Sequence, residues 1–273
     1  MNAWIDGRRA RHVDHRDRGL QYGDGLFETM RVHCGAVRLL DFHLARLLIG
    51  CRRLRFEAPD QRLLRREICA AAALCDAGIL KLIVTRGVGA RGYRPSGSEH
   101  STRILSLRRL TRAHRDASRN PARLRICRTR LGSNPCLAGL KTLNRLESVM
   151  ARLEWTDPRI WEGLMRDADG HVVCGTMSNL FLKTGSTLAT PLLDRCGVAG
   201  VMRRWVMKQS KSLKLRVEER RIHIADLARA DEIFMSNAIV GVVTVGEIRV
   251  GNTRIRPGST DTAVALRTRL DAL

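Results

Sequence analysis

The chain has 273 residues, of which 44% are hydrophobic, and a formal net charge of +22 at pH 7. This composition excludes a largely disordered chain, and no run approaches the roughly 20 apolar residues of a membrane span. The charge does not indicate a nucleic-acid partner, because the arginines are spread along the whole chain, aromatic residues reach only 4% and the usual recognition motifs are missing.

The first 110 residues predict a small α/β domain. Apolar runs and turn signals predict strands, and apolar residues at helical spacing predict helices. Residues 17–25 hold three glycines and two aspartates, which predicts a fixed, tight loop leading into a strand. The predicted strands are 3–6, 26–33, 35–40, 80–87 and 103–110, and the predicted helices are 41–54, with Asp41 as N-cap, and 60–76.

A polar stretch without periodicity at 111–121 predicts a linker between two domains, 1–110 and 122–273. The larger C-terminal domain again mixes helices and strands, so the predicted class is α/β, or more loosely α+β. Its predicted strands are 124–131, two hairpins over 162–175 and 178–191, 216–222 and one long strand over 232–245, and its predicted helices are 144–155, 201–213, 225–230 and 258–272.

Lys141 is the first candidate for chemistry. Only six of the 49 basic residues are lysines, so a lysine here indicates a position where arginine does not serve. Lysine can lose its proton and form a Schiff base, and arginine cannot. The apolar residues 137–140 before it favour desolvation. A solvated loop lysine is the competing interpretation.

Three further segments carry polar groups of interest. The glycines of 197–200 precede a predicted helix, and free backbone N–H groups at a helix start bind anions. Ser236 and Asn237 place two small hydrogen-bonding side chains together. His43 and Arg46 share one face of a helix. Taken one at a time, each segment also fits an ordinary loop, strand or surface.

Taken together, several segments resemble the fold-type IV pyridoxal-phosphate enzymes. They are DRGLQYGDGLFET, HLAR, TRGVGARGY, LAGLKTLNRLESVMAR, SNLF, GVAGVMR and ADEIFMSNA, in this order along the chain. The family holds branched-chain and D-amino-acid aminotransferases and aminodeoxychorismate lyase, and TRGVGARGY and LAGLKTLNRLESVMAR are most similar to the lyase. The resemblance covers residues 3–246.

The resemblance implies a two-domain fold with pyridoxal 5'-phosphate bound at the domain interface. Lys141 matches the lysine that forms the Schiff base, and Arg46 matches the arginine that pairs with the phosphate. The resemblance assigns the other positions as follows: the backbone amides of Val201 and Met202 and the side chain of Asn237 to the phosphate, and Arg91 and Tyr93 to a substrate carboxylate. No metal is expected.

Cys174 departs from the family pattern. The usual motif reads V-x-E-G-x-x-S-N-L-F, and its Glu hydrogen-bonds the pyridine nitrogen of the cofactor. Here Cys174 occupies the position of that Glu. A thiol provides no fixed negative charge unless it ionises. The sequence therefore predicts that Cys174 lines the cofactor site but leaves the ring nitrogen less protonated, which weakens the ring as an electron sink.

The implied activity is that of a carbon–oxygen lyase of folate biosynthesis, which converts 4-amino-4-deoxychorismate to p-aminobenzoate and pyruvate. Two alternatives stay open: a D-amino-acid or branched-chain aminotransferase of the same fold, and a relative that binds cofactor but is catalytically impaired by Cys174. A transaminase depends more strongly on the electron sink than this lyase does, because aromatisation of the product drives the lyase reaction.

The expected partners follow from the same resemblance. A homodimer is implied, together with a functional link to aminodeoxychorismate synthase that requires no stable complex. The N-terminal stretch has no apolar signal core, and the eight cysteines are scattered without a CxxC pair. Free thiols in a reducing cytoplasm are therefore expected, with no zinc or disulfide framework.

Overall fold

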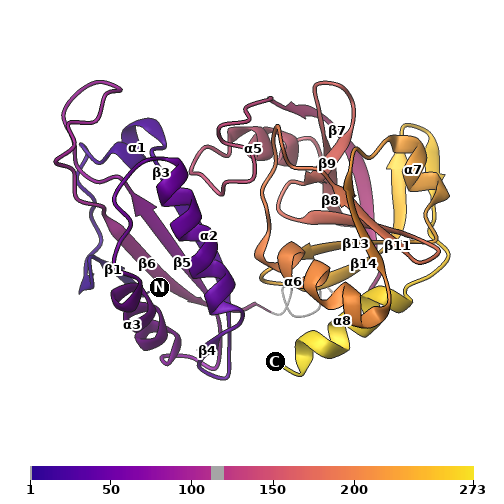
Figure 1. Ribbon diagram of the computed structural model, residues 1–273, viewed down its shortest axis with the longest axis horizontal. Coiled ribbons are helices and arrows are strands. Elements are labelled where there is room, and N and C mark those ends of the chain that lie inside the picture. The colour runs from indigo at the N-terminus through magenta and orange to yellow at the C-terminus, as the bar shows by residue number, and fades with distance from the viewer. Residues whose placement is uncertain (1, 112–119) are drawn as a thin grey trace. The chain divides into compact units, whose positions relative to one another are not determined.

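A computed structural model describes residues 2–111 and 120–273. The chain forms two compact units, and Figure 1 labels most of their helices and strands. The first unit takes in the chain up to Thr111 together with Leu140–Asn144, and the second takes in the rest. Most of the predicted linker, residues 112–119, lies outside the described residues. The composition of the chain gives no sign that Leu140–Asn144 groups with the first unit.

The first unit is an antiparallel sheet in the order β2-β1-β6-β5-β3-β4, with helices packed against it. Its long central pair, β3 and β5, runs in register from Gly25 opposite Thr85 to His33 opposite Ala77. The strands are β1 (Asn2–Ile5), β2 (Arg8–Arg9), β3 (Gly25–His33), β4 (Ala36–Val37), β5 (Ala77–Thr85) and β6 (Arg103–Arg109), and the helices are α1 (Arg18–Tyr22), α2 (Leu40–Arg53) and α3 (Gln61–Ala72).

Three local predictions in this unit are wrong. The predicted strand at 35–40 is limited to β4, because α2 already begins at Leu40. The predicted loop at 17–25 contains α1, because the Asp17 side chain accepts from the Gly19 N–H at 2.8 Å and Gly23 ends the helix in the left-handed conformation. Asp41 is not the N-cap of α2, which begins one residue earlier after Leu39. Asp41 lies instead in the first turn, where its negative charge favours the helix dipole.

The second unit holds a sheet in the order β12-β11-β10-β13-β14-β7-β8-β9, with β15 paired to β14. Pairing is parallel for β11–β12, β14–β7 and β7–β8 and antiparallel elsewhere. The strands are β7 (Ala122–Leu131), β8 (Ile160–Asp167), β9 (Val172–Gly175), β10 (Asn179–Thr184), β11 (Thr187–Pro191), β12 (Arg216–Arg220), β13 (Glu232–Asn237), β14 (Gly241–Val250) and β15 (Thr253–Ile255).

The helices of the second unit are α5 (Leu146–Arg152), α6 (Val201–Ser210), a 3-10 turn (Lys211–Leu213), α7 (Ile224–Arg229) and α8 (Asp261–Asp271). One buried apolar core packs the sheet against α7 through Leu227. Phe181 and Phe234 are also buried, and they stack across β10 and β13 with ring centroids 5.0 Å apart. The predicted helix at 144–155 is shortened to α5. The mixture of helices and strands in both units confirms the predicted α/β class.

The predicted single strand over 232–245 is two antiparallel strands, β13 and β14. The chain turns between them because the Asn237 Oδ1 accepts from the N–H groups of Ile239 at 3.0 Å and Val240 at 2.8 Å. Gly241 then adopts a φ of 84°, which a residue with a Cβ rarely tolerates. An apolar run therefore concealed a turn that places Asn237 at a strand end.

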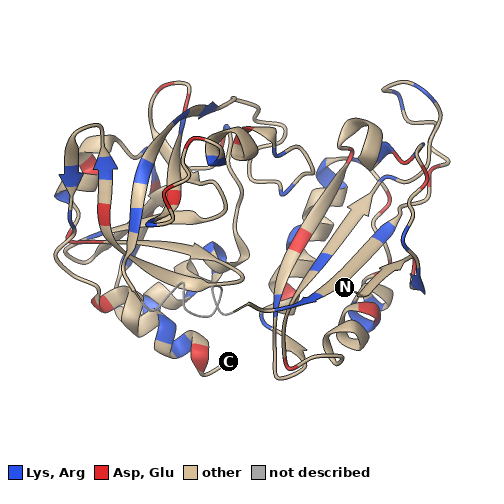
Figure 2. Cartoon of the chain, turned by 180° about the vertical axis from the view of Figure 1, so that it is seen from behind, with Lys and Arg blue, Asp and Glu red and all other residues tan. Residues whose placement is uncertain are grey.

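Figure 2 shows that lysine and arginine lie on strands, helices and loops of both units. This distribution agrees with the spread of arginines along the sequence. In the described part of the chain, no helix has both the length and the apolar character needed to cross a membrane.

Candidate functional site

Lys141 lies on a short segment that runs antiparallel to the start of β3. The Phe27 N–H donates to the Lys141 carbonyl at 3.0 Å, and the Leu143 N–H donates to the Gly25 carbonyl at 3.1 Å. The Nζ of Lys141 lies 4.1 Å from the centre of the Phe27 ring. The two hydrogen bonds therefore fix the backbone of this half-buried lysine, and its amine contacts the Phe27 ring.

Arg46 on α2 is oriented by a buried acid, Glu28 on β3. The Arg46 Nε donates to the Glu28 Oε1 at 2.7 Å, and an Nη of Arg46 contacts the Oε2. The His43 Nδ1 donates to the same Oε2 at 2.6 Å. Glu28 and His43 are 2% and 1% exposed. Glu28 was not singled out as a site residue, although it lies in the DRGLQYGDGLFET motif.

The charges in this cluster fix its protonation. Burial raises the pKa of Glu28, but the Arg46 charge and the His43 hydrogen bond outweigh burial and hold that pKa at about 2. Burial lowers the pKa of His43, and the nearby charges of Arg46 and Lys141 lower it further, although Glu28 opposes them. The charges of Lys141 and Arg46 therefore both act on His43. In this cluster Glu28 is ionised and His43 is neutral.

We expect Glu28→Gln to flatten the acid side of the stability curve. The folded pKa of about 2 lies below the ordinary 4.5, so the stabilisation is complete above pH 4.5 and is lost as pH falls toward 2. This loss amounts to about 3 kcal/mol at most. Thermal unfolding midpoints should fall less for Glu28→Gln than for wild type between about pH 5 and pH 3. The control is Glu57→Gln at an exposed position, and parallel curves for wild type and Glu28→Gln would contradict the assignment.

The start of α6 in the second unit presents backbone donors. Gly200 is its N-cap and offers no side chain, and the first helical bond runs from the Arg204 N–H to the Gly200 carbonyl at 3.0 Å. In the described part of the chain, the N–H groups of Val201 and Met202 have no hydrogen-bond acceptor. Both residues are almost fully buried, and amides without an acceptor at a helix start suit an anionic ligand.

Asn179 of the SNLF motif holds the turn before α6. Its Nδ2 donates to the Val198 carbonyl at 2.9 Å. A Cβ added at Gly200 would lie 2.0 Å from the Asn179 Oδ1, so only glycine allows the turn to approach this side chain. Asn179 is therefore a positioning residue, and in the sequence it stands out only as part of the SNLF motif.

Ser236 and Asn237 end β13 beside this turn. Ser236 pairs in register with Asn179, so the two side chains project from the same face of the sheet. Its Oγ is buried and has no hydrogen-bond partner among the described residues. The Asn237 Oδ1 is occupied by the backbone of the following turn, which leaves its Nδ2 as the available donor.

Cys174 lies on β9 in an apolar cluster with Cys127, Trp155, Met165 and Cys196. It is 9% exposed, and burial is the main cause that raises the pKa of its thiol far above the ordinary value. The thiol is therefore uncharged at neutral pH. It does not supply the fixed negative charge that the family's Glu would provide.

The residues that follow Cys174 are held by a second buried acid, Glu162 on β8. Its Oε1 accepts from the Thr176 N–H at 3.1 Å and from the Thr176 Oγ1, and its Oε2 accepts from the Met177 N–H at 3.2 Å and from the Ser178 Oγ. Burial raises the pKa of Glu162, and these hydrogen bonds oppose the rise. Glu162 is 0% exposed and fixes the turn between β9 and β10, a role with no signal in the linear sequence.

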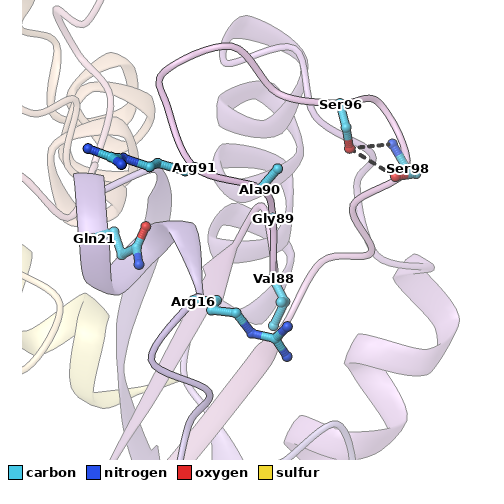
Figure 3. Close-up of a pocket in the computed structure, with 8 residues that line it drawn as sticks. All are labelled: Arg16, Gln21, Val88, Gly89, Ala90, Arg91, Ser96 and Ser98. Atoms are coloured by element: carbon cyan, nitrogen blue, oxygen red, sulfur yellow. Dashed lines mark hydrogen bonds between the residues drawn. The ribbon is translucent and has the colours of Figure 1, made fainter.

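Arg91 and Tyr93 lie on an exposed loop of the first unit. The loop borders an open cavity of about 670 Å³ that is lined by Arg16, Gln21, Val88, Gly89, Ala90, Arg91, Ser96 and Ser98. Figure 3 shows the Arg91 side chain extending outward from the loop, away from Ser96 and Ser98. Tyr93 is 86% exposed. An exposed guanidinium beside an open cavity suits a carboxylate ligand.

The predicted residues thus fall into two sets. In the first unit, Lys141 and Arg46 lie around Phe27 and Glu28, and Arg91 and Tyr93 lie on the exposed loop. In the second unit, Val201, Met202 and Asn237 present hydrogen-bond donors, and Cys174 lies in an apolar cluster. Most of these groups are cationic or hydrogen-bond donors, and the buried Ser236 Oγ without a partner adds another. Within each unit, taken by itself, these groups suit an anionic ligand.

The sequence matches one protein family and is similar to several known proteins along most of its length. A model of the family described as amino-transferase class IV matches residues 25–248. An aminodeoxychorismate lyase from Vibrio harveyi is 33% identical over 252 residues, covering 92% of this chain and 93% of the relative. A putative branched-chain-amino-acid aminotransferase from Methanocaldococcus jannaschii is 30% identical over 260 residues, covering 91% and 88%.

Solved structures of a lyase and of an aminotransferase are also similar to this chain. The crystal structure of 4-amino-4-deoxychorismate lyase from Pseudomonas aeruginosa has a TM-score of 0.93 and 45% identity, covering 99% of this chain and 98% of that one. A branched-chain amino acid aminotransferase from Escherichia coli has a TM-score of 0.84 at 20% identity, covering 100% and 94%, and this likeness concerns the fold. The family match spans most of the chain, and the chain therefore belongs to the class IV amino-transferase family.

Proposed function

We propose that this protein is an aminodeoxychorismate lyase, which uses pyridoxal 5'-phosphate to convert 4-amino-4-deoxychorismate to p-aminobenzoate and pyruvate. The observation that carries the proposal is the fixed position of Lys141 against Phe27, within the segment most similar to the lyase. The 45% identity to the Pseudomonas aeruginosa lyase over nearly the whole chain supports the choice of substrate.

The donor groups of both units fit the proposed cofactor. Lys141 would hold it covalently through Nζ, and the Arg46 guanidinium would pair with the phosphate while Glu28 fixes its orientation. The Val201 and Met202 amides and the Asn237 Nδ2 would donate to phosphate oxygens, and Cys174 would face the pyridine nitrogen. When bound, pyridoxal phosphate supplies an electron-accepting ring conjugated to the substrate amine.

Lys141 also carries the proton transfers. The Lys141 Nζ would remove the proton at C4 of the substrate, and the C–O bond to the enolpyruvyl group would break as the ring becomes aromatic. The same ammonium then protonates the methylene carbon of the departing enolpyruvate, which leaves as pyruvate. The proton balance closes on one group, so no second base is needed. Arg91 and Tyr93 bind the substrate carboxylate.

The uncharged thiol of Cys174 raises the question whether the protein is an active lyase or an impaired relative. An uncharged thiol leaves the ring nitrogen without an anionic partner, so the electron sink is weakened. Aromatisation of the product supplies the driving force that the weakened sink does not. We therefore propose that the chain retains lyase activity, and that a transaminase with the same thiol would lose more.

We expect Cys174→Glu to lower the thermal midpoint of the cofactor-free protein by about 5–10 °C. A carboxylate buried in this apolar cluster loses its hydration, and the Arg145 charge that acts on this position offsets only part of that loss in the cofactor-free protein. Added pyridoxal phosphate should restore more of the midpoint for Cys174→Glu than for wild type, because the new acid gains the ring nitrogen as a partner. The control is Cys174→Ser, and an equal gain for all three proteins would place Cys174 away from the ring.

The remaining assignments extend the same proposal. We propose a small N-terminal domain to residue 110 and a larger C-terminal domain from residue 122, with Leu140–Asn144 grouped with the former. We also propose a homodimer, supported by Leu146, Val149, Met150 and Leu153, which form an exposed apolar stripe on and just after α5. The eight cysteines are free, which supports a cytoplasmic protein that receives its substrate from aminodeoxychorismate synthase.

The test is the release of p-aminobenzoate from 4-amino-4-deoxychorismate by the protein loaded with pyridoxal phosphate, followed by fluorescence. Release that depends on the cofactor is expected. If the protein binds the cofactor but releases no p-aminobenzoate, the next assay measures amino transfer from D-alanine and from isoleucine to keto acids. Amino transfer in this assay would identify an aminotransferase, and inactivity in both assays would identify an impaired cofactor-binding relative.

A further inference from the structure

The loop that carries Arg91 and Tyr93 has no regular structure of its own. Residues 89–102 contain no helix and no strand, and Arg91 and Tyr93 are exposed. A loop with few buried contacts opens easily, so an arginine on it would recognise a carboxylate poorly unless other groups fixed its backbone. The structure provides such a group in Arg18.

Arg18 is only 3% exposed, which is unusual for an arginine. Its Nη1 donates to the Gly92 carbonyl at 2.9 Å and its Nη2 donates to the Tyr93 carbonyl at 2.8 Å. Its Nε donates to Asp24 at 3.0 Å. One planar guanidinium thus joins a carboxylate to two consecutive loop carbonyls, an arrangement that needs the donor fork of arginine.

Tyr22 completes the hold on the loop. The Gly92 N–H donates to the Tyr22 hydroxyl at 3.1 Å, so both backbone polar groups of Gly92 are bonded. The Tyr22 ring lies 4.9 Å from the Arg18 guanidinium carbon and meets the Tyr93 ring edge-on at 5.5 Å. The loop is therefore held by its backbone and by an aromatic contact.

The backbone of Arg18 and the side chain of Asp17 are held at and just after the end of β5. The Arg18 N–H donates to the Gly87 carbonyl at 2.8 Å, and Asp17 accepts from the Thr85 hydroxyl at 2.8 Å. A Cβ at Gly89 would lie 2.9 Å from the Arg18 Cδ, so glycine makes room for the arginine stem. The DRGLQYGDG segment thus connects a central strand of the sheet to the exposed loop.

We propose that Arg18 is a positioning residue that fixes the loop bearing Arg91 and Tyr93 and thereby sets the affinity for a carboxylate-bearing substrate. The role in affinity rests on the proposed function, in which Arg91 binds the substrate. The hold on the loop itself follows from hydrogen bonds within the first unit. Arg18 touches neither the cofactor nor the reacting atoms, so its loss should raise KM and leave kcat nearly unchanged.

The test compares Arg18→Lys with wild type, both loaded with pyridoxal phosphate. Lysine keeps the charge but loses the fork, so trypsin should cut the Arg91–Gly92 bond about ten-fold faster, and KM should rise about ten-fold with kcat within about two-fold. The absorption spectrum of the bound cofactor should not change. Arg62→Lys is the matched control, because Arg62 lies at an exposed position on α3 of the same unit and does not line the cavity.

Tyr22→Phe is the second variant, in case Arg18→Lys folds poorly. It removes the hydroxyl that accepts from Gly92 and keeps the ring, so a smaller rise in cleavage and KM is expected. Unchanged cleavage in both variants, or faster cleavage with an unchanged KM, would overturn the proposal. If wild type releases no p-aminobenzoate, the proposed function fails separately, and the cleavage rate still decides whether Arg18 holds the loop.

Discussion

Lys141→Ala should reduce the release of p-aminobenzoate by at least about a thousand-fold, because in the proposed function one amine both holds the cofactor and moves the protons. The fold should survive the change. The segment is held by the backbone bonds of Lys141 and Leu143 to β3, and these do not involve the lysine side chain. The variant should therefore unfold at nearly the wild-type temperature while its activity is lost.

Lys81 provides a matched control for this experiment. Its Nζ lies 5.1 Å from the same Phe27 ring, but the residue is exposed on β5. Lys81→Ala removes a lysine from β5, the strand that pairs with β3, and should keep wild-type activity. Equal losses for the two variants would assign the effect to the surroundings of Phe27. Full activity in Lys141→Ala would remove Lys141 from the mechanism.

Arg46→Lys should weaken the binding of pyridoxal phosphate by about ten- to a hundred-fold, the equivalent of one or two charge-assisted hydrogen bonds. Arginine can bind Glu28 through one edge and a phosphate through another, and a lysine ammonium lacks this geometry. A lysine leaves Glu28 with a positive partner, so the variant avoids an unpaired buried acid.

Cofactor affinity is measured by equilibrium dialysis of the cofactor-free protein. Arg52→Lys, at an exposed position on the same helix, controls for the change of residue type. An unchanged dissociation constant in Arg46→Lys would place the phosphate elsewhere. A loss of thermal stability without a change in affinity would restrict Arg46 to pairing with Glu28.

The sequence predicted residues that act through their own chemical type. Lysine at 141 was notable because the chain otherwise uses arginine, and the glycines of 197–200 indicated an anion site before a helix. These signals are local, so they can be found without the fold. The resemblance to the family added Arg46, Asn237 and the loop at Arg91.

The sequence did not predict residues that act by holding others, because the partners are far apart in the chain. Glu28 meets Arg46 only after β3 and α2 have packed together, and Glu162 reaches the turn at 176–178 only through the pairing of β8 with β9. Arg18 binds carbonyls 74 and 75 residues away. Such contacts depend on sheet register, which is set by the whole fold.

The predicted strand over 232–245 failed for a different reason. Both β13 and β14 are apolar and buried, and periodicity alone does not separate one long strand from two short ones. The turn between them is set by the Asn237 side chain and by the left-handed conformation of Gly241. Asn and Gly close together in an apolar run were the available signal.

The most direct test of the account is to trap the cofactor on the protein. The protein is loaded with pyridoxal phosphate, reduced with borohydride, digested, and the modified peptide is identified by mass spectrometry. The account predicts the added mass on the peptide that contains Lys141, at close to one per chain. Added mass on Lys81, Lys183, Lys208, Lys211 or Lys214 instead, or no added mass while the cofactor is bound, would contradict it.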